Sequence, residues 1–95
     1  MHKKPNILWF CADQMRYDTI HSLGNSHINT PNLDRLVASG VAFTRTYAQS
    51  TVCTPSRASF LTGRYPSAHR VYRNGVDSFP DDEVVVTKLF ADAGY

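Results

Sequence analysis

The chain has 95 residues, enough for one small domain, and 42% of them are hydrophobic, which is enough for a core. A formal net charge of +2 at pH 7, without a run of basic residues, gives no indication of a nucleic-acid partner. No apolar stretch reaches membrane-spanning length, and two cysteines are too few for a disulfide scaffold or a four-ligand zinc site. We therefore expect neither a nucleic-acid nor a membrane partner.

The first predicted element is a strand at residues 7–11, where ILWFC forms a continuous apolar run. Such a run is typical of a strand that is buried on both faces of a parallel sheet, so we expect Cys11 to be a small buried side chain. Residues 1–5 lead directly into this strand without a hydrophobic signal region and cleavage site. That start predicts a cytoplasmic protein.

Asp13 closes this strand. Binding sites in α/β folds lie at the carboxyl ends of parallel strands, and a hard carboxylate there suits Ca²⁺ or Mg²⁺. Gln14 adds a carbonyl oxygen beside it. A plain aspartate in a turn is the alternative interpretation, and we favour the metal ligand.

A helix and a second strand follow a polar loop at residues 24–26. Thr30 is a good N-cap, Pro31 suits the first helical position, and Gly40 ends the helix. Alternation over residues 41–47 then predicts a strand.

The next helix is predicted from residues 53–57 (CTPSR), with Thr54 as the N-cap, Pro55 at the first helical position and Gly63 as the C-terminal cap. Cys53 would then stand at a helix N-terminus, where free N–H groups and the helix dipole favour negative charge. Arg57 lies about one turn further on. The pair suits recognition of a tetrahedral oxyanion.

Residues 65–83 are expected to be mostly irregular, with a turn at Asn74-Gly75 and a solvated acidic turn at residues 81–83. We expect His69 to lie on the surface or to brace a loop, and Arg64 to contact carbonyl groups at the helix end. A last helix is predicted at residues 85–93. The order of elements is α/β. Because two parallel strands with uncovered faces are a poor independent fold, we expect the chain to be a fragment.

The pattern C-x-P-S-R followed by L-T-G-R resembles the signature of the sulfatases, a family of the alkaline-phosphatase-like superfamily. Residues 4–10 with 13–14, 30–36 and 40–43 resemble the opening strand, first metal ligands, first helix and second strand of that family. The resemblance implies that residues 1–95 are the N-terminal portion of a sulfatase catalytic domain. Its fold would be a mostly parallel sheet sandwiched by helices, here truncated.

The resemblance also implies a chemistry. In sulfatases the motif cysteine, here Cys53, is oxidised to formylglycine by a maturation enzyme that reads the motif. The hydrated aldehyde attacks the sulfate ester with one hydroxyl and releases sulfate through the other. Arg57 would hold that hydroxyl and support its charge. Asp13, Gln14 and the modified Cys53 would bind a divalent metal, with Ca²⁺ favoured and Mn²⁺ or Mg²⁺ as alternatives.

The pair Asp13-Gln14 departs from the Asp-Asp pair of many sulfatases. It is similar to choline-sulfatase-like and phosphonate-monoester-hydrolase-like members. In those subfamilies an asparagine spaced like Asn74 contacts the substrate anion, and we weigh that role equally with an ordinary turn. We predict a sulfuric ester hydrolase, arylsulfatase-like, acting on a small-molecule sulfate ester. The alternatives are a phosphonate or phosphate ester hydrolase using the same site, or an inactive truncated remnant.

Overall fold

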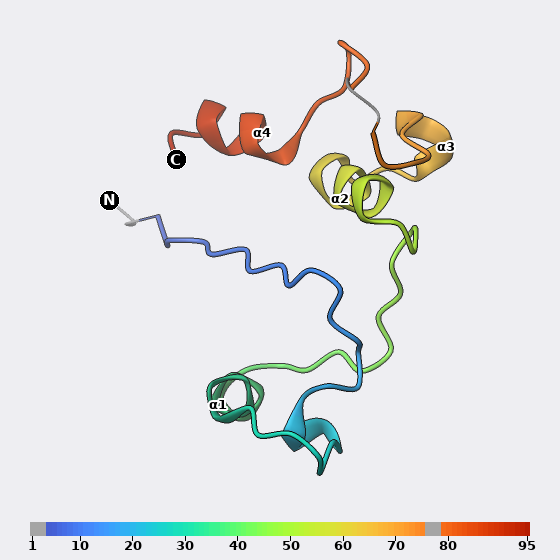
Figure 1. Cartoon of the computed structure of the whole chain (residues 1–95). Coiled ribbons are helices and arrows are strands. Elements are labelled where there is room, and N and C mark those ends of the chain that lie inside the picture. The colour runs from blue at the N-terminus through green and yellow to red at the C-terminus, as the bar shows by residue number, and fades with distance from the viewer. Residues whose placement is uncertain (1–3, 76–78) are drawn as a thin grey trace. The chain divides into compact units, whose positions relative to one another are not determined.

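The structure is a computed structural model that describes residues 4–75 and 79–95. The chain divides into two compact units, Met1–Thr44 and Arg45–Tyr95, and each is described by itself. The described elements, coloured along the chain in Figure 1, are helical: η1 (His21–Leu23), α1 (Pro31–Ser39), α2 (Cys53–Thr62), α3 (Pro66–His69) and α4 (Val86–Asp92). None of the helices in these residues is long and apolar enough to cross a membrane.

The strands predicted at residues 7–11 and 41–47 are not formed, and the described residues contain no strand. The predicted sheet is therefore not confirmed. A strand needs a neighbour that takes up its backbone N–H and C=O groups, and an all-apolar strand needs cover on both faces. Here Leu8 is 90% exposed and Phe43 80% exposed. Cys11 is also exposed, so its predicted burial is wrong.

The first unit is organised around the start of α1. The helix begins at Pro31 and has Gly40 as its C-cap, as predicted. Thr30 is the N-cap residue, but its hydroxyl accepts a hydrogen bond from the His21 N–H (2.9 Å) and donates to Asp34 Oδ1 (2.9 Å). The same carboxylate oxygen accepts from the Ser22 N–H at 3.0 Å. These bonds join η1 to α1.

The Asp34 carboxylate makes this junction sensitive to acid. The hydrogen bond from the Ser22 N–H, aided by the Thr30 hydroxyl, lowers the pKa of Asp34. Because the folded pKa lies below the unfolded value of about 3.9, the stabilisation is complete above that pH and is lost as pH falls through the folded pKa.

We predict that the Ser22 amide proton exchanges faster with solvent as pH falls through this range, after correction for intrinsic exchange. NMR hydrogen exchange measures it. Asp34→Asn should remove the pH dependence, while Asp81→Asn, at an exposed turn residue, should preserve it. A pH-dependent Ser22 amide in the Asp34→Asn protein would contradict the assignment.

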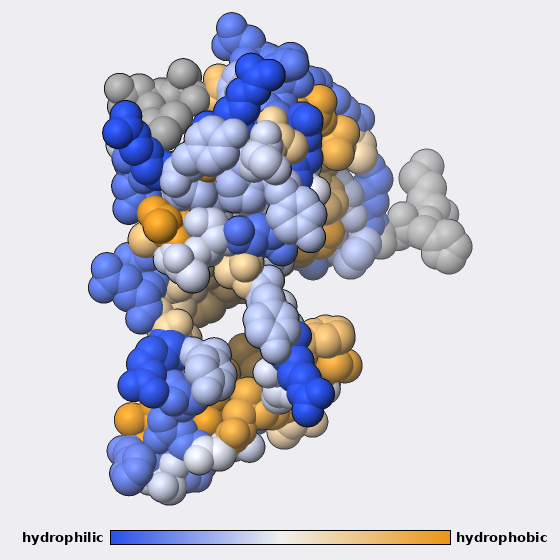
Figure 2. Space-filling view, turned by 90° about the vertical axis from the view of Figure 1, so that its right-hand side faces the viewer, coloured by the Kyte–Doolittle hydropathy of each residue, from blue (hydrophilic) through white to orange (hydrophobic). Residues whose placement is uncertain are grey.

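The second unit contains the described core. Its buried residues are Pro55, Ala58, Ser59, His69 and Val71. No described residue of the first unit is fully buried. Figure 2 shows apolar side chains lying open on the surface of one face. The folding free energy from apolar burial therefore comes mainly from the packing of α2 against α3 and the segment that follows it.

The boundaries of α2 differ from the prediction at one end. Val52 is the N-cap, with extended backbone (φ −101°, ψ 138°), and its carbonyl accepts from the Ser56 N–H at 3.0 Å. Cys53 is thus the first helical residue, and Thr54 is not the cap. The C-terminal prediction is confirmed, because Gly63 is left-handed (φ 69°) and its N–H bonds to the Ser59 carbonyl.

Residues 65–83 are more ordered than predicted. They include α3, whose first residue is Pro66, a favourable helix start. The predicted solvated acidic turn is wrong for Glu83: its side chain is 3% exposed and pairs with Arg64 at 2.7 Å. Arg64 therefore braces this turn through a carboxylate and not through carbonyls. The last helix agrees with its prediction within one residue at each end.

Candidate active site

Cys53 occupies the first turn of α2, as the motif predicts, and its side chain is half-buried. Backbone N–H groups in the first turn of a helix lack intrahelical partners, and the helix dipole adds partial positive charge. Val52 supplies no side-chain cap. The helix dipole therefore places partial positive charge near Cys53, but Pro55 has no N–H, and the Val52 and Thr54 N–H groups already donate to the Ser50 hydroxyl and to Asn74 Oδ1.

Asn74 provides the missing cap from outside the helix. Its Oδ1 accepts a hydrogen bond from the Thr54 N–H at 2.9 Å, across twenty residues of sequence. The structure thus brings Asn74 to the residue next to Cys53. Its carboxamide nitrogen carries two further donors on the same group, which are suited to an anion. Asn74 also lies in a turn with Gly75 (φ 77°), as the alternative interpretation of an ordinary Asn-Gly turn predicts.

Arg57 lies one turn after Cys53 on α2 and is exposed. Side chains four residues apart share a helix face, so Arg57 and Cys53 lie on the same side of α2. A guanidinium presents a planar set of donors that fits the oxygens of a sulfate or phosphate group.

Asp13 and Gln14 belong to the first unit, whereas Cys53 belongs to the second, and each unit is described by itself. Both Asp13 and Gln14 are exposed. Gln14 has a left-handed backbone (φ 53°), a conformation uncommon for residues other than glycine and often found at functional sites. In the part of the chain that the structure describes, no three His, Cys, Asp or Glu side chains gather into a metal cluster.

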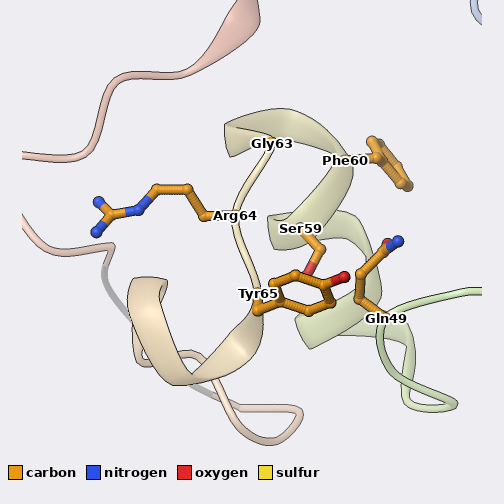
Figure 3. Close-up of a pocket in the computed structure, with 6 residues that line it drawn as sticks. All are labelled: Gln49, Ser59, Phe60, Gly63, Arg64 and Tyr65. Atoms are coloured by element: carbon orange, nitrogen blue, oxygen red, sulfur yellow. The ribbon is translucent and has the colours of Figure 1, made fainter.

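A hollow of about 330 Å³ lies beside the C-terminal half of α2 (Figure 3). In Figure 3 the Tyr65 ring lies next to Ser59, while Arg64 points away. Its lining residues are Gln49, Ser59, Phe60, Gly63, Arg64 and Tyr65. None of the predicted site residues lines it, and the sequence carried no signal for it.

Ser59, which lines this hollow, forms a buried pair with His69, with 2.9 Å between Oγ and Nε2. The Val71 N–H donates to His69 Nδ1 at 3.2 Å, so Nδ1 is the unprotonated nitrogen. Nε2 therefore carries the proton and donates to Ser59 Oγ. A general base needs the opposite arrangement, so this pair is not a serine–histidine nucleophile.

The family model described as "Sulfatase" matches residues 5–95. The chain belongs to the sulfatase family. It is 42% identical over 102 residues to a steryl-sulfatase of Homo sapiens, an alignment that covers 97% of this chain and 18% of the relative. It is 41% identical over 96 residues to an arylsulfatase A of Bos taurus, covering 96% of this chain and 19% of the relative.

A more distant source gives the same family: an ulvan-active sulfatase of Formosa agariphila is 37% identical over 92 residues, covering 97% of this chain and 18% of the relative. The chain thus spans about a fifth of the length of these curated relatives. No solved structure matches it. The predicted family is confirmed.

The capping role of Asn74 predicts a measurable stability effect. Asn74→Ala should lower the free energy of unfolding by about 0.5–2 kcal/mol, because the Thr54 N–H loses its acceptor. Asn74→Asp keeps an oxygen acceptor and places a negative charge at a helix N-terminus, so it should retain wild-type stability. Chemical denaturation measures both. Equal destabilisation by both substitutions would show that the cap contributes nothing.

Proposed function

We propose that this chain carries the nucleophile and anion-binding part of a sulfuric ester hydrolase of the arylsulfatase type. The observation that carries the proposal is the motif at residues 53–57 in the first turn of α2, in a chain of the sulfatase family. The names of the relatives, steryl-sulfatase and arylsulfatase A, support this reaction class. The proposed substrate is a small-molecule sulfate ester.

Cys53 is proposed as the residue that a maturation enzyme converts to formylglycine. Once formed and hydrated, that group supplies an oxygen nucleophile for the sulfur and a second hydroxyl through which sulfate is released. The chain's own contribution is electrostatic. The N-terminus of α2 and the Asn74 carboxamide would stabilise negative charge on the sulfate oxygens. Arg57 would hold the formylglycine hydroxyl and support its charge.

Asp13 and Gln14 fit a divalent metal by their chemistry, since a carboxylate and a carbonyl are the hard oxygen donors that Ca²⁺ prefers. They would provide only part of a shell of roughly six to eight oxygens, and the residue formed from Cys53 would be a further ligand. Mn²⁺ and Mg²⁺ are the alternatives. A metal bound there would polarise the ester oxygens.

A second candidate is hydrolysis of phosphonate or phosphate esters by the same site. The Asp13-Gln14 pair and the spacing of Asn74 from Cys53 motivate it, because both features resemble choline-sulfatase-like and phosphonate-monoester-hydrolase-like members. Turnover of 4-nitrophenyl sulfate against 4-nitrophenyl phenylphosphonate by the full-length protein separates the two. No turnover of either by fully matured, metal-loaded protein would favour an inactive remnant.

Co-expression with a formylglycine-generating enzyme should convert Cys53 to an aldehyde, because the recognition unit of Cys53, Pro55 and Arg57 is intact. Intact-mass spectrometry and hydrazide labelling detect the change. Pro55→Ala and Arg57→Ala should reduce conversion, whereas Cys11→Ser, at the other cysteine, should leave it unchanged. Unmodified thiol under conditions that convert a control sulfatase would refute this assignment.

In the full-length protein, Asp13→Asn should lower metal content and hydrolysis together while Cys53 conversion stays near the wild-type level. The reason is that maturation reads a short local motif, whereas metal binding depends on the charge of the carboxylate. Metal analysis and turnover per mole of formylglycine measure both, with Asp81→Asn as the matched control. Wild-type metal content and turnover in Asp13→Asn would show that Asp13 is a turn residue and not a metal ligand.

A further inference from the structure

His69 is fully buried, at 0% exposure, and it connects two parts of the second unit. It ends α3, and its Nε2 donates to Ser59 Oγ on α2 at 2.9 Å. Its Nδ1 accepts the Val71 N–H at 3.2 Å. Both ring nitrogens are therefore used, one to hold α2 and the other to hold the backbone that leaves α3.

The segment at residues 70–75 runs from this histidine back to the first turn of α2. Arg70 has a left-handed backbone (φ 62°), which reverses the chain after α3, and Val71 is 2% exposed. Three residues later, Asn74 Oδ1 accepts the Thr54 N–H. The segment is thus fixed at its start by His69 and at its end by α2.

The two points of attachment on α2 are Ser59 and Thr54, five residues apart and so separated by about 7.5 Å along the helix axis. A segment held at one point only can swing about it. Because His69 bonds both Ser59 and Val71, it fixes the position of Val71 relative to α2. The position of Val71 in turn determines whether Asn74, three residues later, can bond the Thr54 N–H.

We propose that His69 is a positioning residue that places the Asn74 carboxamide beside Cys53. It touches neither substrate nor the reacting group, because it is wholly buried and its ring nitrogens are both engaged within the fold. The proposal rests on the proposed function for the role of Asn74 in binding the substrate anion. The geometric part, the seating of Asn74 on Thr54, can be measured without any turnover.

Two substitutions test the two hydrogen bonds of His69 one at a time, because each can keep one bond and remove the other. Asn at this position places an oxygen near the site of Nδ1 and can keep the Val71 N–H bond. Gln places a nitrogen near the site of Nε2 and can keep the Ser59 bond. If the Val71 bond directs Asn74, His69→Gln disturbs the seating of Asn74 and His69→Asn preserves it. His27→Gln, at an exposed histidine of the first unit, is the matched control.

The first readout is hydrogen exchange of the Thr54 amide in the full-length protein, measured by NMR. Loss of one hydrogen bond predicts about three- to tenfold faster exchange in His69→Gln. The rate in His69→Asn and His27→Gln should match the wild type. An unchanged Thr54 amide in His69→Gln overturns the proposal.

The second readout is hydrolysis of 4-nitrophenyl sulfate per mole of formylglycine. His69→Gln should raise KM several-fold with a smaller effect on kcat, because Asn74 would contact the bound anion. In an Asn74→Ala background, His69→Gln should add no further change in KM. Additive effects on KM would mean that His69 does not act through Asn74, and would overturn the proposal.

The outcomes distinguish this proposal from the proposed function. If the wild-type protein hydrolyses no ester, the proposed function fails. The exchange rate of the Thr54 amide in His69→Gln then still tests the positioning role of His69. If His69→Gln does not fold, the ¹⁵N resonances of His69 in the wild-type protein provide the test. A protonated Nδ1 would contradict the Val71 hydrogen bond and overturn the proposal, and a protonated Nε2 would support it.

Discussion

The hydrogen bond from the Thr54 N–H to Asn74 Oδ1 is the contact on which the candidate site depends. It fills a capping position that Val52 cannot fill with its apolar side chain. The same bond holds a carboxamide next to Cys53. The cap of α2 and the proposed contact with the substrate anion would therefore come from one side chain, which lies twenty residues after the helix start in sequence.

The buried core of the second unit contains His69, the residue proposed to position Asn74. His69 and Ser59 are polar groups with almost no exposure, and burying them is tolerable because each is hydrogen-bonded. Unlike interchangeable apolar side chains, a histidine bonded through both nitrogens specifies one orientation of its neighbours. The tautomer set by the Val71 N–H gives the pair a structural role, although a serine beside a histidine resembles a catalytic pair in composition.

The first unit differs from the second because it has hydrogen bonds but, among its described residues, no buried core. Its hydrogen bonds around Thr30 and Asp34 are well formed, yet none of its described residues is buried. The apolar run at residues 7–11 lies open to solvent, which is unfavourable for side chains such as Leu8. Local capping is thus sufficient to define α1, whereas an all-apolar strand requires cover on both faces, which the exposed side chains of residues 7–11 do not have.

The sequence by itself determined the ends of α1, the C-terminal cap of α2 at Gly63 and the family, through the motif that begins at Cys53. These features depend on residues within one or two turns of each other, so local propensity and spacing suffice. The start of α2, the burial of His69 and the seating of Asn74 were decided only by the tertiary structure. Each depends on hydrogen-bond partners or packing contacts that chain folding brings together, and no local pattern of residue types encodes such a pairing.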